Sequence, residues 1–241
     1  MSTLREARVI TGRRLSPVVR ELTLDPGEGF SFVAGQWVNL RLPLAPGPPT
    51  EKTEPVVRAY SIASAPRPDG TYDLAVTKVE GGPMSTWLHA VQPGTPVTQS
   101  HAQGFFTLDE PRRPILMIAT GTGISPIRSM LLSLVAAPPD VPIALLFGNR
   151  TEDDILYRDD FEGLARGFRR FTFAPVLSRA SASWSGRTGH VQAHLSELLG
   201  VLGKDVDAYV CGLNRMVGDV RSLLRKEHGL DRGRVHTERY D

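Results

Sequence analysis

The pattern of hydrophobic residues changes near residue 111, and this change constrains the fold more than any other feature of the chain. Before it, short stretches alternate apolar and polar side chains with a period of two. After it, apolar runs of strand length alternate with segments of helical period. We therefore expect two domains, residues 1–110 and 111–241, and a chain of 241 residues has room for both.

The first region has the pattern of a small antiparallel β-barrel. In residues 35–42, Val38, Leu40 and Leu42 alternate with polar side chains, and residues 72–79 repeat the alternation. Short strands at this spacing are typical of barrels. Residues 43–55 are rich in proline, glycine and threonine and are expected to form an exposed loop.

The second region has the pattern of an α/β domain. A buried strand is expected at 115–120, followed by a helix with Ser125 as N-cap and Pro126 in the first helical position. Further strands are expected at 143–147, 171–177, 208–211 and 235–240, and helices near 159–168, 191–202 and 214–227, the last closed by Gly229. This alternation predicts a doubly wound parallel sheet, which binds ligands at the carboxyl ends of its strands.

Composition excludes several classes of protein. Cys211 is the only cysteine of the 241 residues, so this sequence can form neither an intrachain disulfide nor a four-cysteine iron–sulfur site. The six histidines are scattered along the chain, and no metal site is expected. The net charge of +2 and the lack of a basic stripe argue against nucleic acid binding. The short apolar runs and the polar N-terminus predict a cytoplasmic protein without a membrane span.

The turn between the first parallel strand and its helix, Thr120–Pro126, carries two glycines. Glycines let the backbone approach a ligand, and the free N–H groups of a helix N-terminus attract phosphate. The third glycine of the common dinucleotide fingerprint is replaced by Pro126. Taken alone, the turn fits a tight strand–helix connection equally well.

Six segments resemble, in order, those of the ferredoxin–NADP reductase family of flavoproteins. They are Arg58–Ser61 (Arg-x-Tyr-Ser), Lys78–Thr86, Gly104–Leu108 (Gly-x-Phe-x-Leu), Gly121–Pro126 (Gly-Thr-Gly-x-x-Pro), Cys211–Met216 (Cys-Gly-x-x-x-Met) and Glu238–Tyr240. The resemblance implies an FAD-binding barrel followed by a nucleotide-binding α/β domain.

The resemblance also implies an FAD site on the barrel. Arg58 would hold the pyrophosphate, Tyr60 would lie against the isoalloxazine and Ser61 would lie near flavin N5. The implied FAD-binding residues are Arg58, Ala59, Tyr60, Ser61, Val76, Lys78, Gly81, Gly82, Met84, Ser85 and Thr86. Taken singly, Arg58 and Tyr60 also fit a surface strand, and Gly81 and Gly82 a plain turn.

Four residues are candidates for the chemistry itself: Ser61, Cys211, Glu238 and Tyr240. In the family a terminal aromatic residue covers the flavin face that nicotinamide must reach, and here Tyr240 is followed by Asp241, whose carboxylate is expected to alter packing or access. Glu238 would stabilise or relay charge near N5, although a salt bridge also explains it. Cys211 would lie beside the nicotinamide, although free cysteines are often only buried apolar groups.

The nicotinamide dinucleotide would lie on the second domain. The turn and the Cys-Gly segment supply Thr122, Gly123, Pro126, Cys211, Gly212 and Met216. The residues that resemble the 2′-phosphate ligands of members that prefer NADPH are Arg150, Ser178, Arg179 and Arg187, the last of which is expected in a loop. Glu152 or Asp153 would suit the free ribose of NADH, whereas Asp154 is interpreted as the N-cap of a turn at 155–157. The arginines favour NADPH, and NADH stays possible.

The implied activity is hydride transfer from NADPH to FAD, followed by release of single electrons to a ferredoxin or flavodoxin, by a monomeric enzyme. Any iron–sulfur cluster in this path would belong to another protein. One alternative is the NADH-dependent reductase component of a multicomponent oxygenase with a separate ferredoxin subunit. Another is a dinucleotide-sensing module without catalytic activity.

Overall fold

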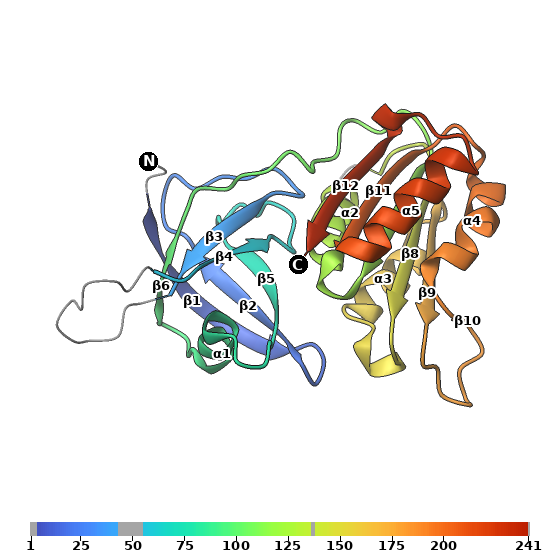
Figure 1. Cartoon of the computed structure of the whole chain (residues 1–241). Helices are drawn as coiled ribbons and strands as arrows, with labels where there is room; N and C mark the ends of the chain where they lie inside the picture. Colours follow the sequence, from blue (N-terminus) through green and yellow to red (C-terminus); the bar gives the residue numbers. More distant parts are fainter. Residues whose placement is uncertain (1–3, 43–54, 136–137, 241) are drawn as a thin grey trace.

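The computed structural model describes residues 4–42, 55–135 and 138–240. The expected loop at 43–55, apart from Pro55, and the expected influence of Asp241 therefore lie outside the described residues. The described residues form two six-stranded sheets side by side, each from one half of the chain (Figure 1). They contain no helix long and apolar enough to cross a membrane.

The first sheet is the antiparallel barrel that the alternating pattern predicts. Its order is β4-β3-β6-β1-β2-β5, and the bridge between Ile62 and Leu74 joins the end of β4 to β5. Its elements are β1 (Arg5–Arg14), β2 (Val19–Asp25), β3 (Trp37–Arg41), β4 (Val57–Ser61), β5 (Tyr72–Thr77), α1 (Pro83–Ala90) and β6 (Pro96–Gln99). The sequence pattern does not indicate β1, because this strand buries only Ala7 and Val9.

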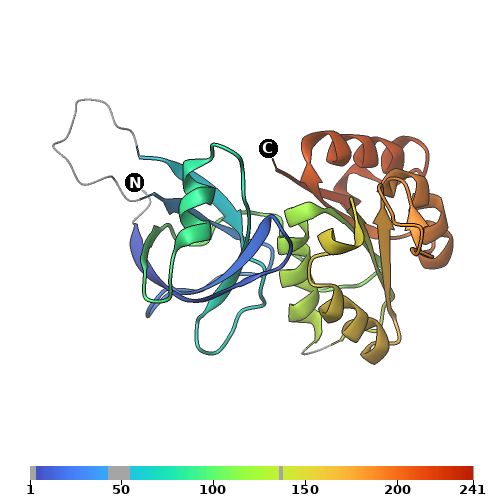
Figure 2. The ribbon, with the colours of Figure 1, turned by 90° about the horizontal axis from the view of Figure 1, so that it is seen from below.

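The second sheet is parallel throughout, in the order β10-β9-β8-β7-β11-β12. Its strands are β7 (Ile115–Thr120), β8 (Ile143–Asn149), β9 (Phe171–Leu177), β10 (Arg187–Thr188), β11 (Asp207–Leu213) and β12 (Val235–Tyr240). The helices α2 (Ile124–Val135) and α3 (Arg158–Gly167) cover one face, and α4 (Leu195–Leu202) and α5 (Asn214–Lys226) cover the other (Figure 2). The predicted doubly wound fold is confirmed.

Three local expectations are wrong. A 3₁₀ turn, η1 (Gly121–Gly123), precedes α2, so Ser125 and Pro126 lie inside the helix and Ser125 is not its N-cap. Asp154 does not cap the turn after it. It is the third residue of η2 (Glu152–Asp154), where its carboxylate accepts hydrogen bonds from Thr151 in a capping box. Arg187 lies in the short strand β10, paired with β9, and not in a loop.

The helix at 191–202 is divided and the helix at 214–227 is nearly as expected. Residues Val191–His194 form a 3₁₀ turn, η3, before α4 begins. Gly229 adopts a φ of 73° after α5, and the N–H of Leu230 reaches back to the carbonyl of Leu224. This is the glycine C-cap that the sequence predicts.

The hydrophobic core has three parts, one of which joins the two halves of the chain. One cluster fills the barrel and a second lies between the parallel sheet and the helices α4 and α5. The third packs α2 and α3 against the sheet and includes Val19, Ala34 and Phe106 from the first half. The proposed boundary at residue 111 lies between β6 and β7. The last strand, β12, ends between the two sheets (Figure 1).

Candidate active site

A cavity of about 810 Å³ lies between the barrel and the carboxyl edge of the parallel sheet. The β1–β2 connection and β5 line its barrel side with Val18 and Thr77, among others. The turn after β7 and the end of β12 line the other side, where Thr122 and Tyr240 lie. The Thr77 and Thr122 hydroxyls are 3.4 Å apart across it. The cleft therefore places the edge expected to bind nucleotide against the barrel.

The structure brings together the four candidate residues for the chemistry. Cys211 on β11 is the register partner of Glu238 on β12. The hydroxyl of Ser61, at the end of β4, donates a hydrogen bond of 3.0 Å to Oε1 of Glu238. The hydroxyl of Tyr240 is buried close to Ser61 and Cys211, but no hydrogen bond of good geometry satisfies it. Residues 177 positions apart thus meet at one point.

Burial dominates the electrostatics at this point. It raises the pKa of Glu238 to about 7, although the hydrogen bond from Ser61 opposes the shift. Burial also raises the pKa of Cys211 well above its ordinary value, and the nearby Glu238 raises it further. The pKa of Tyr240 is raised by the same burial. Cys211 is therefore a neutral thiol at neutral pH, while Glu238 exchanges its proton in that range.

Close backbone approach builds the turn beneath the cavity. A Cβ on Gly123 would lie 2.6 Å from the carbonyl oxygen of Cys211, so no larger residue fits without a backbone shift. Gly212 has a φ of 151°, and a Cβ there would lie 2.3 Å from Oγ1 of Thr120. Thr122, Gly123, Gly212 and Met216 line the cavity, whereas Pro126 is buried in α2 and Cys211 lies behind the lining.

The flavin candidates on β4 pass from exposed to buried along the strand. Arg58 and Ala59 are exposed and Ser61 is buried, while Tyr60 is half-buried, and this burial raises the pKa of Tyr60 to about 12. Among the described residues, the guanidinium of Arg58 donates a hydrogen bond only to the neighbouring carbonyl of Val57, at 2.8 Å. Val76 has its side chain in the barrel core. An exposed arginine beside a half-buried aromatic ring can bind an anionic group and a flat ring together.

The second flavin segment forms the start of α1. Gly82 is its N-cap and Pro83 its first residue, and no side chain caps this end. The N–H groups of Met84 and Ser85 thus belong to an uncapped helix terminus, which attracts anions. The Ser85 hydroxyl donates to the carbonyl of Gly82 at 3.1 Å and shapes the turn. The other candidates here, Lys78, Gly81 and Thr86, are exposed.

The arginines expected near a 2′-phosphate occupy neighbouring loops. The N–H of Arg179 donates to the carbonyl of Arg150 at 2.7 Å, and the N–H of Ser178 donates to that of Asn149. Arg150 and Ser178 line the cavity. The guanidinium of Arg150 lies 3.3 Å from Asp154, and that of Arg187 pairs with Glu197 on α4. Arg179 and Arg187 are not among the lining residues.

Sequence reasoning missed part of the cavity wall. Arg215 lies within the Cys-Gly segment, and its position at the start of α5 was the available signal. Val18 and Val19 carried no signal, because the pattern indicated neither β1 before them nor β2, which begins at Val19. His190 and Gln192 follow β10, which is also too short to be recognised.

Unsatisfied polar atoms around the cavity favour a polar ligand. Four lining residues carry a buried polar atom that finds no hydrogen-bonding partner in the part of the chain that the structure describes: Oγ1 of Thr120, Oδ1 of Asn149, Oε1 of Gln192 and the hydroxyl of Tyr240. Such atoms are costly unless a ligand or water satisfies them. With the exposed Arg58 and the uncapped α1, the residues present fit a bound dinucleotide.

Comparison with known proteins places each half of the chain in a domain family. Residues 6–107 match the model of oxidoreductase FAD-binding domains, and residues 117–222 match the model of oxidoreductase NAD-binding domains. The chain is 49% identical to ferredoxin–NADP reductase B of Sorangium cellulosum over 98% of this chain and 97% of that protein. It is 30% identical to the phenol hydroxylase P5 protein of Acinetobacter pittii, of which it spans 65%.

Solved structures share the fold across the whole chain. A ferredoxin NADP⁺ reductase from Neisseria gonorrhoeae with bound FAD and NADP superposes with a TM-score of 0.84 at 22% identity, covering 99% of both chains. The FAD/NAD-binding domain of a nitric oxide dioxygenase from Vibrio cholerae gives 0.85 at 22% identity, covering 98% of both. At this identity the likeness shows the fold alone.

Proposed function

Because the chain belongs to the ferredoxin–NADP reductase family and is an FAD-dependent NAD(P)H oxidoreductase, we propose that it uses NADPH and passes single electrons to a ferredoxin- or flavodoxin-type carrier. The observation that carries this proposal is the hydrogen bond between Ser61 and Glu238. It joins β4, the flavin strand of the barrel, to β12, which pairs with the strand of Cys211 at the carboxyl edge of the parallel sheet.

The barrel would hold FAD. Arg58 and the N-terminus of α1 would bind the two phosphates, and Tyr60 would support the ring. When bound, FAD supplies the redox chemistry, since it accepts two electrons together from a nicotinamide and can release them singly. The protein contributes orientation, exclusion of water and charge stabilisation around it.

Ser61 and Glu238 would control a proton at the reacting edge. With a pKa of about 7, Glu238 is protonated in part of the molecules at neutral pH. The hydroxyl of Ser61 can donate a hydrogen bond toward the reacting edge of a ligand. The carboxyl of Glu238 can hold a proton and return it to Oγ of Ser61. Tyr240 lines the cavity where nicotinamide would enter, so its ring must move before the nucleotide can reach the flavin. Because its thiol is neutral, Cys211 would contribute by packing in the site and not by exchanging a proton.

The arginines support NADPH over NADH. In each of the ion pairs Arg150–Asp154 and Arg187–Glu197, one partner has more than half of its side chain exposed, so solvent screens the pair and a phosphate dianion can compete with the carboxylate. Glu152, one of the two residues that would suit a free ribose beside Asp153, accepts hydrogen bonds from Ser181 instead. Arg187→Leu should raise the KM for NADPH about tenfold or more and leave that for NADH unchanged. Arg170→Leu is the control, because Arg170 pairs with Asp140 at the opposite edge of the sheet.

The relatives support two different electron acceptors. The 49% identical relative is a ferredoxin–NADP reductase, which favours a free carrier, and the phenol hydroxylase protein favours an oxygenase component. We propose the free carrier, because the relative of nearly equal length is also the more similar of the two. We also propose a monomeric enzyme, because one chain supplies both sides of the candidate site.

The test uses the purified full-length protein. Flavin released by denaturation should be FAD, and anaerobic NADPH should bleach it. Reduction of a cytochrome c reporter should then depend on added ferredoxin or flavodoxin. Turnover only with an oxygenase component would support the alternative. A protein that binds nucleotide but shows no bleaching with NADPH or NADH would be a sensing module.

A further inference from the structure

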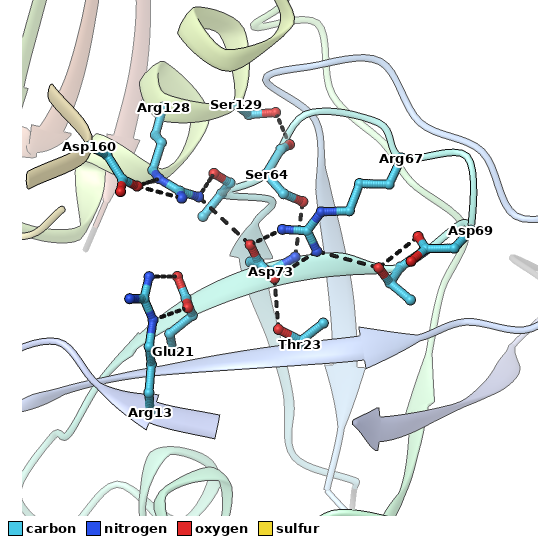
Figure 3. Close-up of polar contacts among 12 residues, drawn as sticks. Arg13, Glu21, Thr23, Ser64, Arg67, Asp69, Asp73, Arg128, Ser129 and Asp160 are labelled. Carbon is cyan, nitrogen blue, oxygen red and sulfur yellow. Dashed lines mark hydrogen bonds and ion pairs between the residues drawn. The ribbon is translucent and has the colours of Figure 1, made fainter. Parts of the chain in front are cut away.

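A network of charged side chains joins the barrel to the α/β domain away from the reacting residues (Figure 3). It links Arg67 and Arg128 with Asp73 and Asp160, and the proposed mechanism uses none of them. A separate ion pair within the barrel, Arg13 with Glu21, lies beside it. Arg128 on α2 is the centre of this network, with only 7% of its surface exposed.

Arg128 contacts both domains at once. Its Nη1 donates to the carbonyl of Ala63 in the barrel at 2.8 Å and lies 3.7 Å from Oδ2 of Asp73 on β5. Its Nε and Nη2 donate to Oδ2 of Asp160 on α3, at 3.0 and 2.7 Å. The guanidinium lies 4.1 Å from the centre of the Tyr157 ring. A guanidinium has the planar fork that such divided contacts require.

Ser129, the next residue of α2, also binds a backbone carbonyl of the barrel. The hydroxyl of Ser129 donates to the carbonyl of Ser64 at 2.6 Å. Two consecutive side chains of one helix therefore hold two consecutive carbonyls of the barrel. Asp73 fixes the same segment from the other side, since its N–H donates to the Ser64 hydroxyl and its carboxylate pairs with Arg67.

The network connects the two halves of the candidate active site through few residues. Ala63 lies two positions after Ser61, which contacts Glu238. Arg128 lies in α2, which begins directly after the nucleotide turn Gly121–Gly123. Any rotation of α2 relative to the barrel must break the contacts of Arg128 and moves the turn relative to Ser61.

The backbone beneath Arg128 is held in an unusual conformation. Tyr157 has a φ of 57°, and it is the only non-glycine residue with positive φ in the part of the chain that the structure describes. Its ring is buried under the guanidinium. Such conformations persist where the surroundings enforce them, often at sites where geometry matters for function. Buried ion pairs are also weak evidence for stability alone, because their desolvation offsets their attraction.

We propose that Arg128 is a positioning residue, which fixes the angle between the two domains and so aligns the nicotinamide with the flavin ring. This inference rests on the proposed function for its kinetic consequence. The structural consequence, a fixed domain angle, stands independently.

The experiment compares Arg128→Met and Arg128→Lys with wild type as holoenzymes. Misplacement of reactants by about 1 Å can cost 10²-fold in rate. Arg128→Met should therefore slow single-turnover flavin reduction by about 10- to 100-fold while FAD content and NADP⁺ affinity stay within about threefold. Arg128→Lys should recover part of the rate. Arg158→Met is the matched control, because Arg158 pairs with Glu162 within α3 and leaves the barrel untouched.

A distance measurement makes the domain angle visible without activity. Spin labels at Arg8→Cys on β1 and Lys204→Cys after α4 occupy exposed positions, and the native Cys211 is buried. The label–label distance should be narrow in the wild type and broad in Arg128→Met. If that variant yields no holoenzyme, Asp73→Asn takes its place, because it removes the carboxylate through which Arg128 pairs with the barrel.

Equal rates per bound FAD and an unchanged distance distribution, with only a lower melting temperature, would overturn the proposal. If the wild type itself is not reduced by either nucleotide, the proposed function fails. The distance distributions then still decide whether Arg128 fixes the domain angle.

Discussion

At the scale of single residues, the contact between Ser61 and Glu238 concentrates the chemistry of the cleft. Each side chain comes from a different sheet, and the hydrogen bond of 3.0 Å forms only when both sheets are in place. Sequence patterns named both residues through the family resemblance. They could not indicate the raised pKa of Glu238, because burial at a domain interface depends on the tertiary packing of both domains.

Replacing Glu238 by Gln should change how stability depends on pH. The carboxyl ionises near its ordinary pKa of 4.5 in the unfolded chain but near a pKa of about 7 in the folded one. Folding therefore loses stability as pH rises through this interval, and the loss is complete above it. Glu238→Gln should melt close to the wild type at about pH 4 and at a higher temperature at about pH 8. Thermal melts across this range check the prediction, and a pH-independent difference would contradict it.

Cys211 should be inert toward alkylating reagents in the native protein. Its side chain is fully buried, and burial with the nearby Glu238 raises the pKa of the thiol, so little reactive thiolate exists. Mass spectrometry after iodoacetamide treatment should show no adduct on the holoenzyme and one adduct in denaturant. Rapid labelling of the folded protein would mean that the thiol is accessible.

At the scale of elements, the parallel strands were the most predictable part of the fold. The strands 115–120, 171–177 and 235–240 match their sequence-based bounds. For 115–120 the reason is that a strand covered on both faces is an apolar run that ends at turn residues, whereas the edge strand 235–240 is mostly polar and half-buried. The barrel strands β1 and β2 were missed. Their exposed faces are charged and only some of their side chains are buried, so neither period nor composition marks β1 as a strand.

The glycine turn is the element whose geometry should tolerate change least. Gly123→Ala places a methyl group 2.6 Å from a backbone carbonyl, so η1 must move away from β11. We expect a lower melting temperature and a Kd for NADP⁺ raised about tenfold or more. Thermal melts measure the stability, and titrations with NADP⁺ measure the Kd.

Gly218→Ala is the matched control for the glycine turn. A Cβ at Gly218 in α5 meets no atom within 4 Å, so alanine should stabilise the helix by about 0.5–1 kcal/mol. Nucleotide affinity should stay unchanged. Similar behaviour of the two variants would contradict the role given to Gly123.

At the scale of the whole molecule, the two domains work as one because a shared core and a shared charge network hold them together. The core cluster around α2 includes residues from both halves, and Arg128 reaches across the same interface. The resemblance predicted the two folds and their order. It could not predict the domain contacts, since Arg128 and Ser129 belong to no recognised pattern and their partners are backbone carbonyls about 65 residues away.

The central claim is that the cleft lets a nicotinamide deliver a hydride to FAD held by the barrel. Anaerobic single-turnover reduction of the holoenzyme, with NADPH or with NADPH deuterated at C4, tests it most directly. We predict stoichiometric bleaching of the flavin that is slower with the deuterated nucleotide. An FAD-loaded protein whose absorbance stays unchanged with both NADPH and NADH would contradict the account.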